Sequence, residues 1–65
     1  MKAYEVIAKR IRQRGITKAE LARRVSIDQE LLRRSLQGKR KIPADEFIRL
    51  CYELELRLSD FPRSQ

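Results

Sequence analysis

Two helix-start signals lie so close together that they constrain the fold more than any other feature of the chain. Residues 17–20 (Thr-Lys-Ala-Glu) fit a capping box, in which the threonine hydroxyl and the glutamate carboxylate each bond the other residue's backbone N–H. A helix that begins there should end near Val25. Asp28 then provides an N-cap, because its carboxylate can accept from the free N–H groups of a new first turn. The sequence therefore predicts two short helices, at about 17–25 and 28–37, joined by a tight turn.

The second of these helices has a narrow apolar side and a broad polar side. At 100° per residue, one side holds Asp28, Leu32, Ser35 and Leu36. The other side holds Glu30, Arg33, Arg34 and Gln37, with Gln29 beside them. A helix with a cationic front and an apolar back is suited to insertion into a groove, although ordinary surface helices also have exposed polar faces.

The flanking segments carry further helical patterns. Ala3, Ile7 and Ile11 recur four residues apart in a helix expected at about 3–14, which Gly15 should end. Pro43 should precede another helix, because its missing N–H costs nothing there. The buried face of that helix should hold Phe47, Leu50, Cys51 and Leu54. With a short last turn at 58–61, the sequence predicts an all-α, compact four- to five-helix bundle, a single domain over 1–62 and a frayed tail at 63–65.

Positive charge is concentrated in one half of the chain. The net charge is +7, but residues 9–41 contain twelve Lys and Arg against three acidic residues, a balance of +9. Residues 42–65 have a balance of −2. A strongly cationic half is expected of a surface that binds a polyanion, and the alternative is a solvated face that keeps the protein soluble.

The composition offers little for catalysis or metal binding. The chain has no histidine and a single cysteine, Cys51, so it lacks a disulfide framework and a zinc-ligand cluster. The adjacent Asp45 and Glu46 are explained by the positive end of a helix dipole, and there is no glycine-rich phosphate loop. We expect no enzyme activity, cofactor, metal or small-molecule ligand. No signal peptide or membrane-length apolar run is visible, so a soluble cytoplasmic protein is expected.

The order of these residues is similar to that of a known family. Leu21-Ala22 followed by Ile27, Leu32 and Gly38, at the same spacing, resembles the lambdoid phage repressor and Cro (Xre-type) helix-turn-helix family. The resemblance extends through Gly38-Lys39-Arg40-Lys41 and on to Phe61, so it covers nearly the whole chain. It implies a lambda-repressor-like DNA-binding domain, encoded by a bacterium or phage and associated with the nucleoid. In that family the second motif helix enters the major groove.

The resemblance assigns DNA-contacting roles by position. The residues expected to read bases are Gln29, Glu30, Arg33 and Arg34. The residues expected to contact phosphate are Lys18, Lys39, Arg40 and Lys41. The chemistry agrees: Arg34 can donate twice to guanine, Gln29 can bridge adenine, and Glu30 can accept from cytosine.

The chain departs from the family pattern at several positions. Ser26 and Glu55 each stand where the family commonly has glycine. Leu31 replaces a Ser or Thr that lies near phosphate; it could contact a thymine methyl, pack sideways into the fold or weaken DNA binding. Ile11 and Leu36 occupy two positions that many relatives fill with a buried Arg–Glu ion pair. Replacing both charges avoids leaving one unpaired, so we expect Ile11 and Leu36 to form an apolar pair.

Two function classes remain open from the sequence. The leading hypothesis is sequence-specific binding of double-stranded DNA by a small transcriptional regulator of the repressor/Cro kind, as a homodimer on a pseudo-palindromic operator. The candidate dimer residues are Leu56, Leu58 and Phe61, which could equally close the core. The alternative is a protein-interaction module, such as an antitoxin or adaptor, with secondary or lost DNA binding. Leu31 and Glu30 favour this alternative, and the +9 half opposes it.

Overall fold

The computed structural model describes residues 1–62, and the predicted tail at 63–65 lies outside the described residues. The elements are α1 (Ala3–Arg14), α2 (Lys18–Val25), α3 (Gln29–Leu36), α4 (Ala44–Leu54) and a 3₁₀ turn, η1 (Leu58–Asp60). Residues 1–62 contain no strand, which confirms the all-α prediction. Helices α2 and α3 fall within the ranges predicted for the two closely spaced helices.

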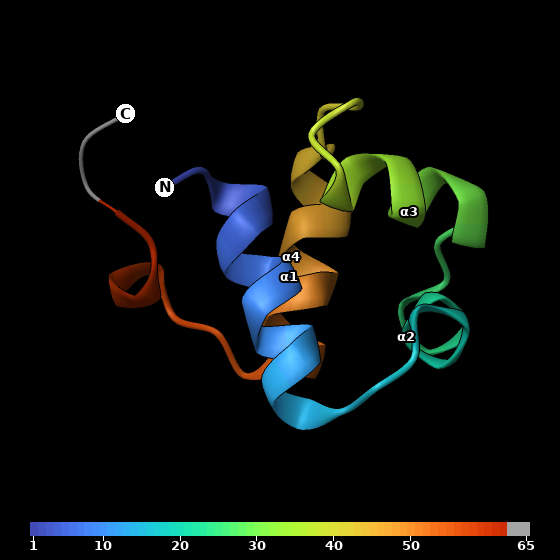
Figure 1. Cartoon of the computed structure of the whole chain (residues 1–65), viewed down its shortest axis with the longest axis horizontal. Helices are drawn as coiled ribbons and strands as arrows, with labels where there is room; N and C mark the ends of the chain where they lie inside the picture. Colours follow the sequence, from blue (N-terminus) through green and yellow to red (C-terminus); the bar gives the residue numbers. More distant parts are fainter. Residues whose placement is uncertain (63–65) are drawn as a thin grey trace.

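Helices α1 and α4 form the centre of the molecule (Figure 1). Helices α2 and α3 lie together on one side of this pair, and η1 lies on the other. Helix α3 contacts both α1 and α2, and α2 also contacts α4. This arrangement holds the polar side of α3 at the periphery while its other side faces the core.

The core is a single cluster to which all four α-helices contribute. Its five most deeply buried apolar side chains, at most 1% exposed, are Ile7, Leu21, Leu32, Leu50 and Leu54. The stripe predicted for α1 is partly wrong, because Ala3 is exposed and Val6 is buried instead. Helix α1 packs against both α3 and α4, so its buried face is broader than a single stripe of residues spaced four apart. Ala3 is the first residue of α1 and lies at the end of that face.

The two motif helices begin at the predicted caps. The Thr17 hydroxyl accepts from the Glu20 backbone N–H at 3.1 Å, but the reciprocal half of the capping box is absent. The Glu20 carboxylate instead accepts from two arginines of its own helix, Arg23 and Arg24. The Asp28 carboxylate accepts from two backbone N–H groups of the first turn of α3, at 3.0 and 3.1 Å, as predicted.

Two helices end on residues other than glycine in the left-handed region. Ser26 follows α2 with φ 57°, and Glu55 follows α4 with φ 55°, both at positions where the family commonly has glycine. Glu55 is held by an ion pair with Arg14 and by Arg10, which donates to the carbonyls of Leu54 and Glu55 at 2.8 and 3.3 Å. No side-chain hydrogen bond of Ser26 occurs within residues 1–62, so its strain has no such compensation.

We therefore expect Ser26→Gly to stabilise the protein by about 0.5–1 kcal/mol, since relief of the left-handed strain exceeds the extra chain entropy of glycine. Thermal unfolding followed by circular dichroism measures the change. Ser26→Ala is the matched control, because it keeps the Cβ and should leave the melting temperature nearly unchanged. A glycine variant that melts no higher than the alanine variant would contradict the strain at this turn.

Ile11 and Leu36 occupy the two positions at which many relatives have a buried Arg–Glu ion pair. Both side chains are buried in the core cluster. They are 6% and 8% exposed, respectively. Helices α1 and α3, which carry them, pack directly against each other. The burial of both side chains agrees with the expectation of apolar packing at these two positions.

Leu36→Glu should destabilise the protein by about 3 kcal/mol or more, because a single charge would be buried without a partner. A domain of this size has little stability to lose, so we expect a largely unfolded chain at room temperature. The double variant Ile11→Arg/Leu36→Glu should recover part of the loss by supplying the opposite charge. Circular dichroism of the three proteins tests both points, and a Leu36→Glu protein that melts like the parent would disprove the pairing.

Candidate DNA interface

The polar side of α3 is exposed while the opposite side is buried. Gln29, Glu30, Arg33 and Arg34 are all accessible to solvent. The buried residues of α3 are Leu32, Ser35 and Leu36, as the helical pattern predicted. The structure therefore gathers the four predicted base-reading residues on one surface, fixed by the packing behind them.

These four side chains differ in whether they already form hydrogen bonds with other residues of the protein. Arg33 donates from Nε to a Glu30 carboxylate oxygen at 3.0 Å and from Nη2 to the other oxygen, and its Nη1 donates to the Gln37 amide oxygen at 3.2 Å. The hydrogen bond from Arg33 is the main cause that lowers the pKa of Glu30. Gln29 and Arg34 make no side-chain hydrogen bond or ion pair within residues 1–62, so their polar groups are open to a ligand.

The loop after α3 contains two kinds of cation. Arg40 donates to both carboxylate oxygens of Glu46 at 3.0 and 3.2 Å, and also to the Ser35 hydroxyl at 3.0 Å. Its side chain is only 23% exposed. Lys39 and Lys41 on either side are exposed and have no acidic partner among the described residues. Arg40 thus joins the loop to α3 and α4. From the sequence we expected only a phosphate contact for this residue.

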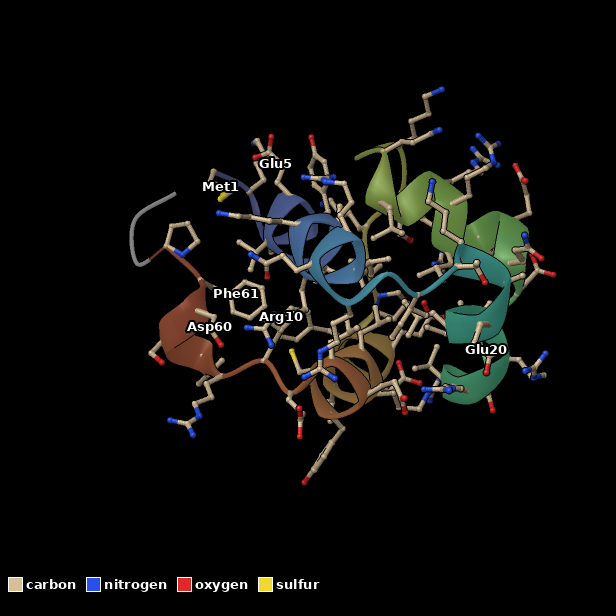
Figure 2. The ribbon with its side chains drawn as sticks, turned by 60° about the horizontal axis from the view of Figure 1, so that its bottom comes forward. Met1, Glu5, Arg10, Glu20, Asp60 and Phe61 are labelled. Atoms are coloured by element: carbon tan, nitrogen blue, oxygen red, sulfur yellow. The ribbon has the colours of Figure 1, made fainter. Side chains whose placement is uncertain are left out.

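Lys18 lies at the first residue of α2, where it is exposed. No ion pair of Lys18 occurs within residues 1–62, so its ammonium group is available to a phosphate. Glu20, two residues later on α2 (Figure 2), bonds Arg23 and Arg24 instead. The bond from Arg24 is the main cause that lowers the pKa of Glu20.

Two contacts from α4 fix the end of α2 and the turn before α3. Arg49 donates from Nε to the Val25 carbonyl at 2.8 Å, which satisfies one of the free carbonyls at the end of α2. Arg24 joins α2 to α4 through Glu53 at 3.0 Å. Sequence reasoning missed both contacts, because their partners are far apart in the chain and no local pattern connects them.

The candidate dimer residues lie at the other end of the molecule and do not form one surface. Leu56 is only 8% exposed and belongs to the core, and the Phe61 ring packs against Phe47 with 5.2 Å between ring centroids. Phe61 lies beside Arg10 and Asp60 in Figure 2. Leu58 is 82% exposed. Two of the three residues therefore close the core, which is the alternative left open from the sequence.

Two kinds of structural feature, a metal-ligand cluster and a membrane-spanning helix, are absent from the described residues. No group of three or more His, Cys, Asp or Glu within 1–62 could hold a metal ion. No described helix is long and apolar enough to cross a membrane. Cys51 is partly buried against the core, and burial is the main cause that raises the pKa of its thiol. The neutral thiol has the packing role that the apolar face predicted.

Comparison with known proteins agrees with this geometry. The family model described as Cro/C1-type HTH DNA-binding domain matches residues 6–62, which include both motif helices and the loop after α3. No curated protein and no solved structure matches the chain. The family match confirms the predicted resemblance, and it does not favour the protein-interaction alternative. This family is a class of DNA-binding regulators rather than of enzymes. The chain belongs to the Cro/C1-type helix-turn-helix family, whose members bind DNA and regulate transcription.

Proposed function

We propose that the chain acts by occupying an operator in double-stranded DNA, with α3 in the major groove, in the manner of a small repressor. The observation that carries this proposal is the open polar surface of α3. Arg34 and Gln29 make no side-chain hydrogen bond or ion pair within residues 1–62, while the residues behind them are buried in the core. Side chains held on a rigid helix with free donors are suited to reading base edges.

The predicted site residues divide into three roles in this proposal. Arg34 and Gln29 read bases directly, by bidentate bonds to guanine and adenine. Arg33 and Glu30 bond each other in the free protein and exchange that exposed, weak bond for bases on binding. Phosphate contacts come from Lys18, Lys39 and Lys41. Arg40 is assigned a positioning role, since its guanidinium group already binds Glu46 and Ser35.

We expect Arg34→Ala to remove the base preference at one position of the binding site and to weaken specific binding by about 1–3 kcal/mol. Selection of bound duplexes from a random pool, followed by titration of the selected site, measures both effects. Arg12→Ala is the matched control, because Arg12 is an exposed arginine of α1 that has no ion pair among the described residues and lies neither in the pocket lined by Ile48 and Leu58 nor on α3. A parent protein that selects no motif would contradict sequence-specific binding.

The proposed operator complex is a homodimer, as two half-sites one helical turn apart require a two-fold protein. Three large apolar side chains of one shallow pocket remain exposed: Ile48 and Tyr52 of α4 and Leu58 of η1. Their exposed fractions are 53%, 82% and 82%. We assign the dimer contact to this apolar surface, which retains Leu58 from the original candidates and leaves Leu56 and Phe61 beneath it.

The double variant Tyr52→Glu/Leu58→Glu should convert dimers to monomers, since it would place like charges across a two-fold contact. Its binding to a full palindrome should lose cooperativity, while its affinity for an isolated half-site should be unchanged. Sedimentation of the free protein and of the DNA complex measures the stoichiometry. The conservative Tyr52→Phe should behave as the parent, and a double variant that still binds cooperatively would rule out this surface.

A further inference from the structure

A groove separates the start of α1 from the loop that follows α3. Its lining includes Lys2 and Tyr4 from the start of α1, and Gly38, Lys39 and Lys41 from the loop. We call it the Tyr4 groove. It is continuous with the proposed DNA-binding surface, because Lys39 and Lys41 belong to both. The α1 side of the groove is not among the residues that the sequence analysis assigned to DNA.

The ring of Tyr4 lies against Gly38, in the space that a Cβ atom at that position would occupy. A Cβ atom built on Gly38 would lie 2.6 Å from Cζ and 2.7 Å from the hydroxyl oxygen of Tyr4. Gly38 also has φ +77°, which disfavours other residues. The backbone therefore favours glycine here, and a larger residue would also require the Tyr4 ring to move. The close approach places the Tyr4 hydroxyl beside the loop.

The Tyr4 hydroxyl has no hydrogen-bond partner within residues 1–62, although the residue is partly buried. The hydroxyl is not among buried atoms left without a partner in the described part of the chain, so it is open to solvent. Here it remains a free donor beside the groove.

The charges that line the groove are unbalanced. Lys2, Lys39 and Lys41 make no ion pair among the described residues, whereas Arg40 is neutralised by Glu46. The nearby carboxylate of Glu5 accepts from the Lys2 backbone N–H at 2.6 Å and so caps the start of α1. Three lysines without an ion pair and one hydroxyl donor line the same groove, and ammonium and hydroxyl donors are the groups that bind phosphate oxygens.

We propose that the Tyr4 groove binds a backbone phosphate of the operator duplex, beyond the phosphates held by the loop alone. The Tyr4 hydroxyl donates to a phosphate oxygen, and Lys2 supplies positive charge from the α1 side. The groove thereby extends the DNA contact from the loop onto the first helix. This inference rests on the proposed function, since it names a further phosphate site of the same DNA complex.

The test uses the full chain and a duplex selected from a random pool, with binding measured by fluorescence anisotropy over a series of salt concentrations. Lys2→Ala should reduce the steepness of the salt dependence by about 0.9, the value for one phosphate contact. Tyr4→Phe keeps the ring on Gly38 and removes only the hydroxyl. It should weaken binding about 3- to 10-fold without changing the salt slope, as expected for loss of one neutral donor. Both effects should be equal for selected and unrelated duplexes.

Lys9→Ala is the matched control, because Lys9 is an exposed lysine of α1 that has no ion pair among the described residues and does not line the groove. Its salt slope should equal that of the parent. Thermal melts of the three variants should coincide with that of the parent. If Lys2→Ala behaves like Lys9→Ala and Tyr4→Phe binds like the parent, the phosphate site is disproved while operator binding stands. A parent protein that binds no duplex overturns both.

Discussion

The packing of one side of α3 against the core determines what the rest of the molecule can do. Helix α3 has eight residues, too few to be stable alone in water. Leu32 and Leu36 anchor it in the core, and Asp28 satisfies the free N–H groups at its start. Ser35, also buried, is bonded by Arg40, so the same helix face orders the cationic loop. The polar side of α3 is displayed rigidly only because its other side is fixed in this way.

Some cationic side chains of the protein form ion pairs within it, and others are free to bind a ligand. The arginines that form ion pairs within residues 1–62 are Arg10, Arg14, Arg23, Arg24, Arg33, Arg40 and Arg49. None of the lysines in that part of the chain has an acidic partner. The guanidinium fork suits fixed bidentate contacts, whereas a lysine keeps a mobile point charge. The cationic side chains without an ion pair in residues 1–62 are therefore the lysines and three arginines, Arg12, Arg34 and Arg57, of which Arg34 lies on α3.

Much of the fold could be predicted because its signals are local. The caps at Thr17 and Asp28, the glycine after α1 and the proline before α4 each act within one helical turn, and the helices begin and end close to them. The errors lie where distant segments meet. Val6 replaces Ala3 in the core because α1 packs on two helices. The Glu20 carboxylate bonds arginines of α2, one of which also reaches Glu53 of α4.

The sequence by itself determined the helices, the polar side of α3 and the family, since periodicity, capping and residue order are properties of short segments. The tertiary structure decided which of the candidate side chains are free. Arg40 proved to be engaged with Glu46, Leu56 is buried in the core, and the partly buried Phe61 packs against it. Only the folded chain brings Tyr4 onto Gly38 and Arg49 onto the end of α2. The physical reason is that a side chain's partners depend on the spatial crossing of helices, which sequence spacing does not encode.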